Sequence, residues 1–151
     1  IVWGMPKPKI GRIEAALGRK ASNRTKMAVM RGEEEGRASI THYEVLRGLP
    51  KGALEPVASL VRCTLETGRT HQVRVHMTHI GHPLLGDATY GAGFLSSTRK
   101  LSHPAQAALT DLGRQALHAA ELSFEHPKSR KIMKFKSEMP VDMSRLLAAL
   151  E

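Results

Sequence analysis

The stretch "LETGRTHQVRVHMTHIGHP" at residues 65–83 determines how the middle of the chain is organised. It starts at the end of a segment in which apolar and polar side chains alternate, as they do along a β-strand, and then passes through a Thr-Gly turn. From His71 the apolar residues recur at helical spacing, and the Gly-His-Pro sequence at 81–83 ends the pattern. We therefore expect a strand, a turn and a helix of about three turns.

The segments around this stretch predict an α+β fold. Residues 38–48 ("ASITHYEVLRG") and 57–67 ("VASLVRCTLET") both alternate, and the Gly/Pro turn between them favours an antiparallel pair. A second strand pair is expected from 117–127 and 130–140, and a closing helix at 141–151. The expected fold class is α+β, with a mixed, mainly antiparallel sheet and flanking helices.

The remaining segments are assigned from their turn-forming residues. The apolar opening "IVWG" predicts a short strand that ends at the Gly/Pro cluster of 4–11, and "KMAVM" at 26–30 predicts another strand. "GEEEG" at 32–36 indicates a charged turn. Residues 82–93 indicate a loop, and 101–115 a linker with a short helix.

The charge of the chain points to an anionic partner. Its 151 residues suit one domain and include 23 Lys and Arg against 14 Asp and Glu. The formal charge of +9 and the pI near 10.1 favour a polyanion, most often nucleic acid, although a merely basic surface gives the same totals. No apolar run approaches the ~20 residues of a membrane-spanning helix and no signal peptide is visible, so a cytoplasmic protein is expected.

Several kinds of site are excluded by what the sequence lacks. Cys63 is the only cysteine, which excludes an internal disulfide and a cysteine-based zinc site. It lies within an alternating segment, where we expect a buried and unreactive thiol. The G-x-S-x-G elbow of a serine nucleophile and the glycine–lysine spacing of a phosphate-binding loop are both absent.

Two kinds of site compete for the polar residues of 65–83, and the first is a metal site. His76, His79 and His82 are three residues apart and could share a helix face. Helical zinc sites usually use the HExxH spacing or add acidic or cysteine ligands, and the helix offers neither. We therefore expect no metal, and histidines that pack within the helix.

The second kind is an anion site built on arginines. Arg69 lies at the expected strand–helix junction, and Arg74 lies about one and a half turns into the helix. The free amides and positive dipole of a helix N-terminus favour an anion, and His71 and Gln72 add hydrogen-bond donors. The group suits a phosphate or a carboxylate, and ordinary salt bridges of the two arginines stay open as an alternative.

Longer motifs resemble a known family. The segment "LETGRTHQVRVHMTHIGHPLLGDATYG" at 65–91 resembles the third sequence motif of RluA/RluD-type pseudouridine synthases. "ASITHYEVL" is similar to the A-x-T-x-Y strand of that family, "RTKMAV" to its K-M-x-V strand, and "LHAAELSFEHP" to its L-H-A-x-x-L-x-x-x-H-P segment. The resemblance implies the fold of a pseudouridine synthase catalytic domain. It also implies isomerisation of uridine to pseudouridine in large-subunit rRNA, with no metal and no organic cofactor.

One family motif is missing. Enzymes of this family attack the nucleoside with an aspartate in an H-R-L-D-x-x-T-S-G motif, and nothing similar occurs in the sequence. The resemblance therefore implies that residues 1–151 are the C-terminal portion of a catalytic domain that is incomplete at its N-terminus. We expect little or no activity from this chain alone, and self-association through exposed sheet edges.

The resemblance also implies roles for the residues of the anion site. Arg74 would pair with the catalytic aspartate and hold its carboxylate ionised and oriented. Arg69, His71 and Gln72 would shape the rim of the site and contact the RNA backbone.

Supporting roles are expected for residues on either side. The basic residues of 19–26, including Arg24 and Lys26, would contact RNA phosphates, or else form a solvated basic face. His76 and Asp87 would organise the loop around the site. Two other function classes stay open, a non-catalytic RNA-binding module and a metal-dependent hydrolase that uses the histidine cluster.

Overall fold

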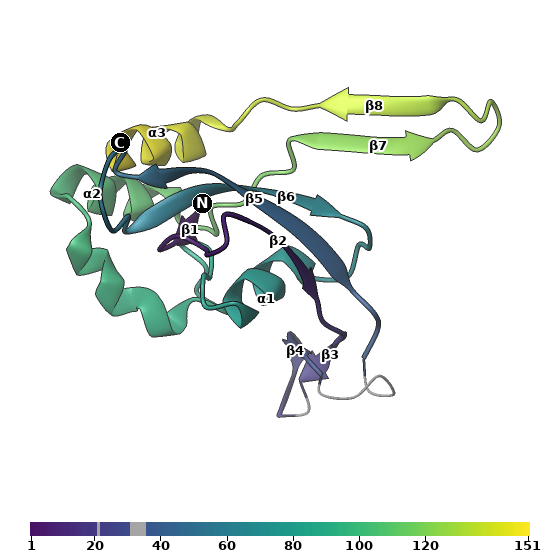
Figure 1. The fold of residues 1–151 in the computed structure, drawn as a ribbon, viewed down its shortest axis with the longest axis horizontal. Coiled ribbons are helices and arrows are strands. Elements are labelled where there is room, and N and C mark those ends of the chain that lie inside the picture. Colours follow the sequence, from purple (N-terminus) through teal and green to yellow (C-terminus); the bar gives the residue numbers. More distant parts are fainter. Residues whose placement is uncertain (21, 31–35) are drawn as a thin grey trace.

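The structure of the protein is a computed structural model that describes residues 1–20, 22–30 and 36–151 (Figure 1). Strands β1 to β6 come first along the chain and the first helices follow them, as the expected α+β class requires. Their order is β1 (Val2–Trp3), β2 (Ile10–Glu14), β3 (Leu17–Lys20), β4 (Asn23–Val29), β5 (Ile40–Leu49), β6 (Ala58–Leu65), α1 (Gln72–His79), the 3-10 helix η1 (Ala92–Lys100), α2 (His103–Leu112), β7 (Glu121–Glu125), β8 (Ile132–Lys136) and α3 (Val141–Leu150). The charged turn expected at 32–36 lies outside the described residues, except for Gly36.

The main sheet has the strand order β1-β6-β5-β2 and is antiparallel at each pairing. The expected pairing of the two alternating segments is confirmed as β5 with β6, in a register that sets Thr41 opposite Leu65 and Tyr43 opposite Cys63. Thr41 and Tyr43 are buried, so this face of β5 lies against the core.

Strand β2 was not expected, because the Gly/Pro cluster of 4–11 was taken as a turn throughout. Its residues pair with β5, and Gly11 lies opposite Tyr43. A Cβ atom at Gly11 would lie 2.6 Å from the Tyr43 ring, so only glycine lets the ring cross the strand there. Gly11, a residue type that usually interrupts strands, therefore allows close packing of the Tyr43 ring within this sheet.

Helix α1 is also shorter than expected, since it spans eight residues, or about two turns. His71 precedes it with φ 56°, a left-handed conformation that a helix cannot include. The expected short helix and closing helix are confirmed as α2 and α3. These two helices pack together with Trp3 and Leu49 in one apolar cluster, and α1 contributes Met77 to a second.

Two sequence expectations about burial and membranes can be compared with the fold. Cys63 on β6 is half-buried rather than fully buried, and burial raises the pKa of its thiol to about 11, which keeps it protonated and unreactive at neutral pH. None of the described helices is long and apolar enough to cross a membrane.

The hairpin of β7 and β8 extends away from the rest of the molecule (Figure 1). Its register sets Leu122 opposite Phe135 and Phe124 opposite Met133. These four residues share one face of the hairpin, all four are exposed, and the Phe124 and Phe135 rings stack with centroids 5.8 Å apart. The hairpin therefore presents an apolar face that no described residue covers.

We predict that the 151-residue chain on its own associates with a second copy through this face, because an exposed apolar two-stranded surface favours pairing with another chain. Changing both Phe124→Ser and Phe135→Ser should shift the chain to monomer in sedimentation equilibrium. The matched control is Lys134→Ser, which alters the opposite face and should leave the association unchanged. Equal association of the double variant and the original chain would contradict the prediction.

Candidate RNA-modifying site

The centre of the candidate site is an ion pair between helix α1 and the loop that follows it. Arg74 Nε donates to one carboxylate oxygen of Asp87 at 2.7 Å, and Arg74 Nη2 donates to the other at 2.8 Å. The Arg74 side chain is 12% exposed and that of Asp87 is fully buried. This two-point geometry is the strongest that a guanidinium and a carboxylate form, and it fixes the plane of the guanidinium.

The backbone of the loop also binds the Asp87 carboxylate. The oxygen that accepts from Arg74 Nη2, which is Oδ1, also accepts hydrogen bonds from the backbone amides of Thr89 and Tyr90, each at 3.0 Å. Burial alone would raise the pKa of Asp87, but the hydrogen bonds from Arg74 and from these amides outweigh it and hold that pKa below its ordinary value. Asp87 is therefore ionised at neutral pH, and the hydrogen bond to it raises the pKa of Arg74.

Gly86 lets this loop approach the backbone of the segment at Arg114 closely. It has φ 73°, and a Cβ atom there would lie 2.2 Å from the backbone oxygen of Arg114. The next residue in the loop is Asp87, so the position of the carboxylate depends on a glycine at 86.

Tyr90 connects this pair to the strand hairpin β3–β4. Its ring forms a cation–π contact with Arg74, in which the central guanidinium carbon of Arg74 lies 4.8 Å from the centroid of the Tyr90 ring. Its hydroxyl accepts a hydrogen bond from the Met27 amide at 3.0 Å and lies 2.9 Å from Nδ1 of His71. Burial and the nearby Arg74 charge lower the pKa of His71, so its ring is neutral at neutral pH.

The other side of α1 is fastened to β5 by buried polar side chains. His76 is fully buried, with Nε2 3.1 Å from the Ala15 carbonyl oxygen and Nδ1 2.9 Å from the Thr41 hydroxyl. A carbonyl can only accept, so Nε2 carries the proton and Nδ1 accepts from Thr41. Burial lowers the pKa of His76, although its hydrogen bond to Ala15 opposes this, and the ring is neutral.

Both the nitrogen and the oxygen of the Gln72 side-chain amide form hydrogen bonds within the protein. Its amide nitrogen donates to the Ile40 carbonyl at 2.9 Å and to the Thr41 hydroxyl at 3.0 Å. Its oxygen accepts from the Thr67 hydroxyl and from the Arg69 amide, each at 2.9 Å. Gln72 therefore fixes the turn that carries Arg69.

Four of the residues named from the sequence meet at one hollow of about 310 Å³: Arg69, His71, Gln72 and Arg74. Its other lining residues are Leu65, Val73, Gln115 and Leu117. Nη1 of Arg74 forms no hydrogen bond with any described residue, so one edge of the guanidinium keeps its donors for a second anion. Arg74 is thus held from one edge and available at another.

The two basic residues named on β4 lie elsewhere. Lys26 extends to the Thr89 carbonyl oxygen at 3.4 Å, and Arg24 is exposed. Neither lines the hollow beside Arg74.

The histidines do not converge. His76 is engaged with Thr41 and Ala15, His79 is exposed, and His82 Nδ1 lies 2.8 Å from the Trp3 carbonyl oxygen. Within residues 1–20, 22–30 and 36–151, no group of three His, Cys, Asp or Glu side chains is arranged to hold a metal ion.

Sequence reasoning did not assign Tyr90 and Thr41, which connect the site to β4 and to β5. Tyr90 stands in the quoted "GDATYG" and Thr41 in the quoted "ASITHYEVL", so the motif carried the signal although single residues did not. Their contacts reach residues far away in sequence, which spacing alone cannot predict.

The family model described as RNA pseudouridylate synthase matches residues 2–79, which include β1 to α1 and Arg74. The chain belongs to the RNA pseudouridylate synthase family. It is 45% identical over 150 residues to "Ribosomal large subunit pseudouridine synthase D" of Zymomonas mobilis, covering 99% of this chain and 43% of that protein. It is 43% identical to the protein of the same name from Nitrosomonas europaea, covering 94% of this chain and 37% of that protein. The chain thus spans less than half the length of these curated relatives.

Solved structures agree on the fold. The chain superposes on "Human RNA Pseudouridylate Synthase Domain Containing 1" with a TM-score of 0.68 at 29% identity, covering 98% of this chain and 55% of that one. For "Human RNA Pseudouridylate Synthase Domain Containing 4" the TM-score is 0.67 at 23% identity, covering 99% of this chain and 59% of that one. The expected α+β architecture of the family is confirmed.

We predict that the Arg74–Asp87 pair stabilises the fold far more than a similar pair at the surface. Asp87→Asn keeps an oxygen for the Thr89 and Tyr90 amides but leaves a buried guanidinium without its counter-charge, and should lower the free energy of unfolding by about 3 kcal/mol. The matched control is Asp142→Asn, since Asp142 binds Arg114 with the same two-point geometry at an exposed position. Urea denaturation measures both, and equal losses would contradict the prediction.

We also predict that stability falls as the pH is lowered below about 6.5, the ordinary histidine pKa. The unfolded chain then takes up a proton on His76, whereas the folded chain, with its lowered pKa, resists doing so. His76→Gln should therefore flatten the pH dependence of the free energy of unfolding by up to one proton, or about 1.4 kcal/mol per pH unit. ¹⁵N chemical shifts of His76 should report the neutral Nε2–H form at pH 6. A charged ring at that pH would contradict the assignment.

Proposed function

We propose that the full-length gene product isomerises uridine to pseudouridine in large-subunit ribosomal RNA, and that this chain supplies the arginine side of the active site. The observation that carries the proposal is the Arg74 guanidinium, which Asp87 holds at one edge while Nη1 stays without a described partner at the edge of a hollow. Two relatives are named "Ribosomal large subunit pseudouridine synthase D", and this name supports the choice of large-subunit ribosomal RNA as the substrate.

In this proposal residues 1–151 form the C-terminal portion of the catalytic domain, and an aspartate outside it is the nucleophile. Arg74 would donate to that carboxylate from its unused edge, keep it ionised and orient it. The uridine would leave its stack and enter the hollow. The bond between the sugar and N1 of the uracil breaks, and the uracil turns. C5 then forms a bond to the sugar and loses its proton, while N1 gains a proton. All atoms of the substrate are retained, so no co-reactant is needed.

The other residues would act through position or through RNA contacts. Arg69 and His71, at the rim, would contact the RNA, and Gln72 would hold Arg69 in place rather than contact RNA itself. Arg24, which is exposed on β4, would reach phosphates from that side, and the half-buried Lys26 would do so beside Thr89.

His76 and Asp87 would be positioning residues. The first fastens α1 to β5, and the second holds Arg74. We also propose that the reaction takes place in the cytoplasm, as expected from the sequence.

We predict that Arg74→Ala and Arg74→Lys both abolish product, by at least about a hundredfold, because neither replacement presents a planar fork to a carboxylate. RNA affinity should change less than about tenfold, because the other basic residues remain. The measurement is pseudouridine mapping in large-subunit rRNA from cells that carry only the variant, with folding checked by circular dichroism.

The matched control is Arg145→Ala, which removes an exposed arginine on α3 that does not line the hollow. It should leave product formation intact. A wild-type protein that binds RNA but forms no pseudouridine would favour the non-catalytic RNA-binding module instead. Wild-type rates in Arg74→Lys would remove Arg74 from its role.

A further inference from the structure

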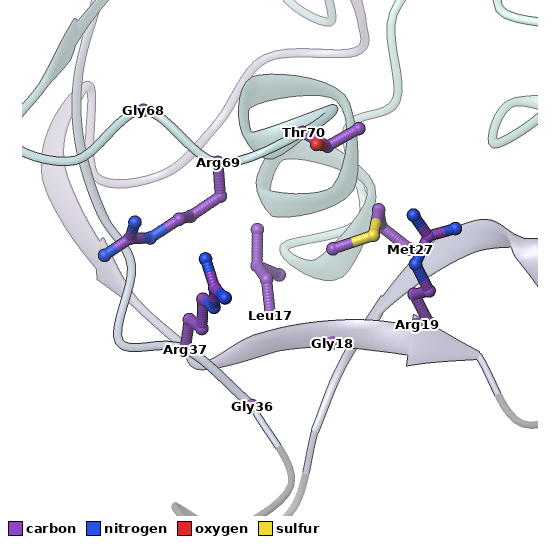
Figure 2. Close-up of a pocket in the computed structure, with 9 residues that line it drawn as sticks. All are labelled: Leu17, Gly18, Arg19, Met27, Gly36, Arg37, Gly68, Arg69 and Thr70. Atoms are coloured by element: carbon purple, nitrogen blue, oxygen red, sulfur yellow. The ribbon is translucent and has the colours of Figure 1, made fainter.

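A second hollow, of about 480 Å³, lies between the β3–β4 hairpin, the segment at 36–37 and the turn at 68–70 (Figure 2). Three arginines from these three separate segments line it: Arg19, Arg37 and Arg69. Leu17 and Met27 give it apolar surface, and Leu17 is 1% exposed. A cationic rim with an apolar floor suits a phosphate-bearing, partly apolar ligand.

No described carboxylate lies within ion-pair distance of these three arginines, and the same holds for Arg24, Arg99 and Arg145. Six other arginines have such a partner: Arg12, Arg47, Arg62, Arg74, Arg114 and Arg130. What distinguishes Arg19, Arg37 and Arg69 is that they line one hollow. Figure 2 shows Arg37 and Arg69 on one side of the hollow and Arg19 on the other. An anion bound in the hollow would be stabilised by the positive charges on both sides of it.

Hydrogen bonds fix the backbone at Arg37 and Arg69 and the side chain of Arg19. Arg37 exchanges two backbone hydrogen bonds with Leu17, at 2.8 and 2.9 Å. The Arg69 amide donates to Gln72 Oε1 at 2.9 Å, and Arg19 Nη1 donates to the Arg24 carbonyl at 2.8 Å. The segments that carry the three arginines are therefore fixed relative to the hollow, and the Arg19 guanidinium needs less ordering when an anion binds.

Arg69 lines this hollow and also the one beside Arg74. The two hollows therefore share a wall, and a ligand that fills both passes across Arg69. A nucleic acid strand has the repeating negative charge that such a path requires.

We propose that the hollow lined by Arg19, Arg37 and Arg69 binds a backbone phosphodiester of the substrate RNA, close to the nucleotide held beside Arg74. The site rests on the proposed function for its ligand. It contacts phosphate rather than a base, so it positions the strand and carries no sequence information.

The test compares Arg37→Ala with Arg145→Ala in the full-length gene product. Arg145 is an exposed arginine on α3 that lines neither hollow, so both variants lose one charge. Arg37→Ala should weaken binding to a large-subunit rRNA fragment roughly tenfold and reduce the slope of log affinity against log salt by about one. Arg145→Ala should change neither beyond the loss of general charge, and Arg37→Lys should restore most of the slope. Identical salt slopes for Arg37→Ala and Arg145→Ala would overturn the proposal.

A second arm locates the phosphate. Methylphosphonate linkages, which lack the negative charge, are placed one at a time along the RNA. One position should weaken binding of the wild-type protein and cause a smaller further loss in Arg37→Ala, because part of the same contact is already removed in that variant while Arg19 and Arg69 remain. Additive losses at every position would overturn the proposal.

Product formation separates this site from the proposed function. If Arg37 contacts a phosphate equally in the bound substrate and in the transition state, Arg37→Ala should raise KM and leave kcat unchanged. If the wild-type protein forms no pseudouridine but the slopes still differ, the proposed function fails and the phosphate site stands. If it forms product and the slopes are equal, only the phosphate site fails. A wild-type protein that does not bind RNA overturns both.

Discussion

The ion pair between Arg74 and Asp87 is the interaction on which the candidate site depends. It is formed across the boundary between helix α1 and the loop that follows, at 2.7 and 2.8 Å, in a place where the carboxylate has no contact with solvent. Burying two charges costs free energy, and the structure offsets this cost with the Thr89 and Tyr90 amides and the Tyr90 ring. The result is a guanidinium whose plane is fixed before any substrate arrives, as electrostatic catalysis requires.

The opposite side of α1 is held by neutral groups. His76, Thr41 and Gln72 form a chain of hydrogen bonds in which each donor has an acceptor. Such a network is favourable only when it is complete, because an unpaired buried polar group is expensive. Helix α1 is therefore held by a charged contact on the side of the hollow and by uncharged hydrogen bonds on the side of the sheet. These contacts fix its position although it has only about two turns.

The distribution of arginine partners connects this local chemistry with the charge of +9. Several arginines are neutralised by carboxylates at the surface or in the core, whereas those around the second hollow have no carboxylate partner among the described residues. Arg69 joins the two hollows, and Gln72 holds Arg69. In the functions proposed above, RNA would be the ligand of this surface, with a phosphate bound at one hollow and the nucleoside at the other.

Much of this could be predicted from the sequence, for physical reasons that differ between elements. Alternation predicted β5 and β6 because residues on opposite faces of each strand differ in burial, and helical spacing predicted α1 because one side of that helix is buried. Strand β2 could not be predicted, since the value of Gly11 lies in its contact with Tyr43, which belongs to another strand. The start of α1 was placed too early, because the left-handed conformation of His71 is set by its surroundings and not by residue type.

The sequence by itself determined the family, the basic character and the short list of polar residues at 65–91, because these are properties of residue type and of spacing along the chain. Only the tertiary structure decided how they are used. It set Asp87 against Arg74, committed Gln72 to the protein interior and brought Arg37 beside Arg69. Partners of this kind come from segments far apart in the chain, and their meeting depends on how the sheet, the helix and the loops pack.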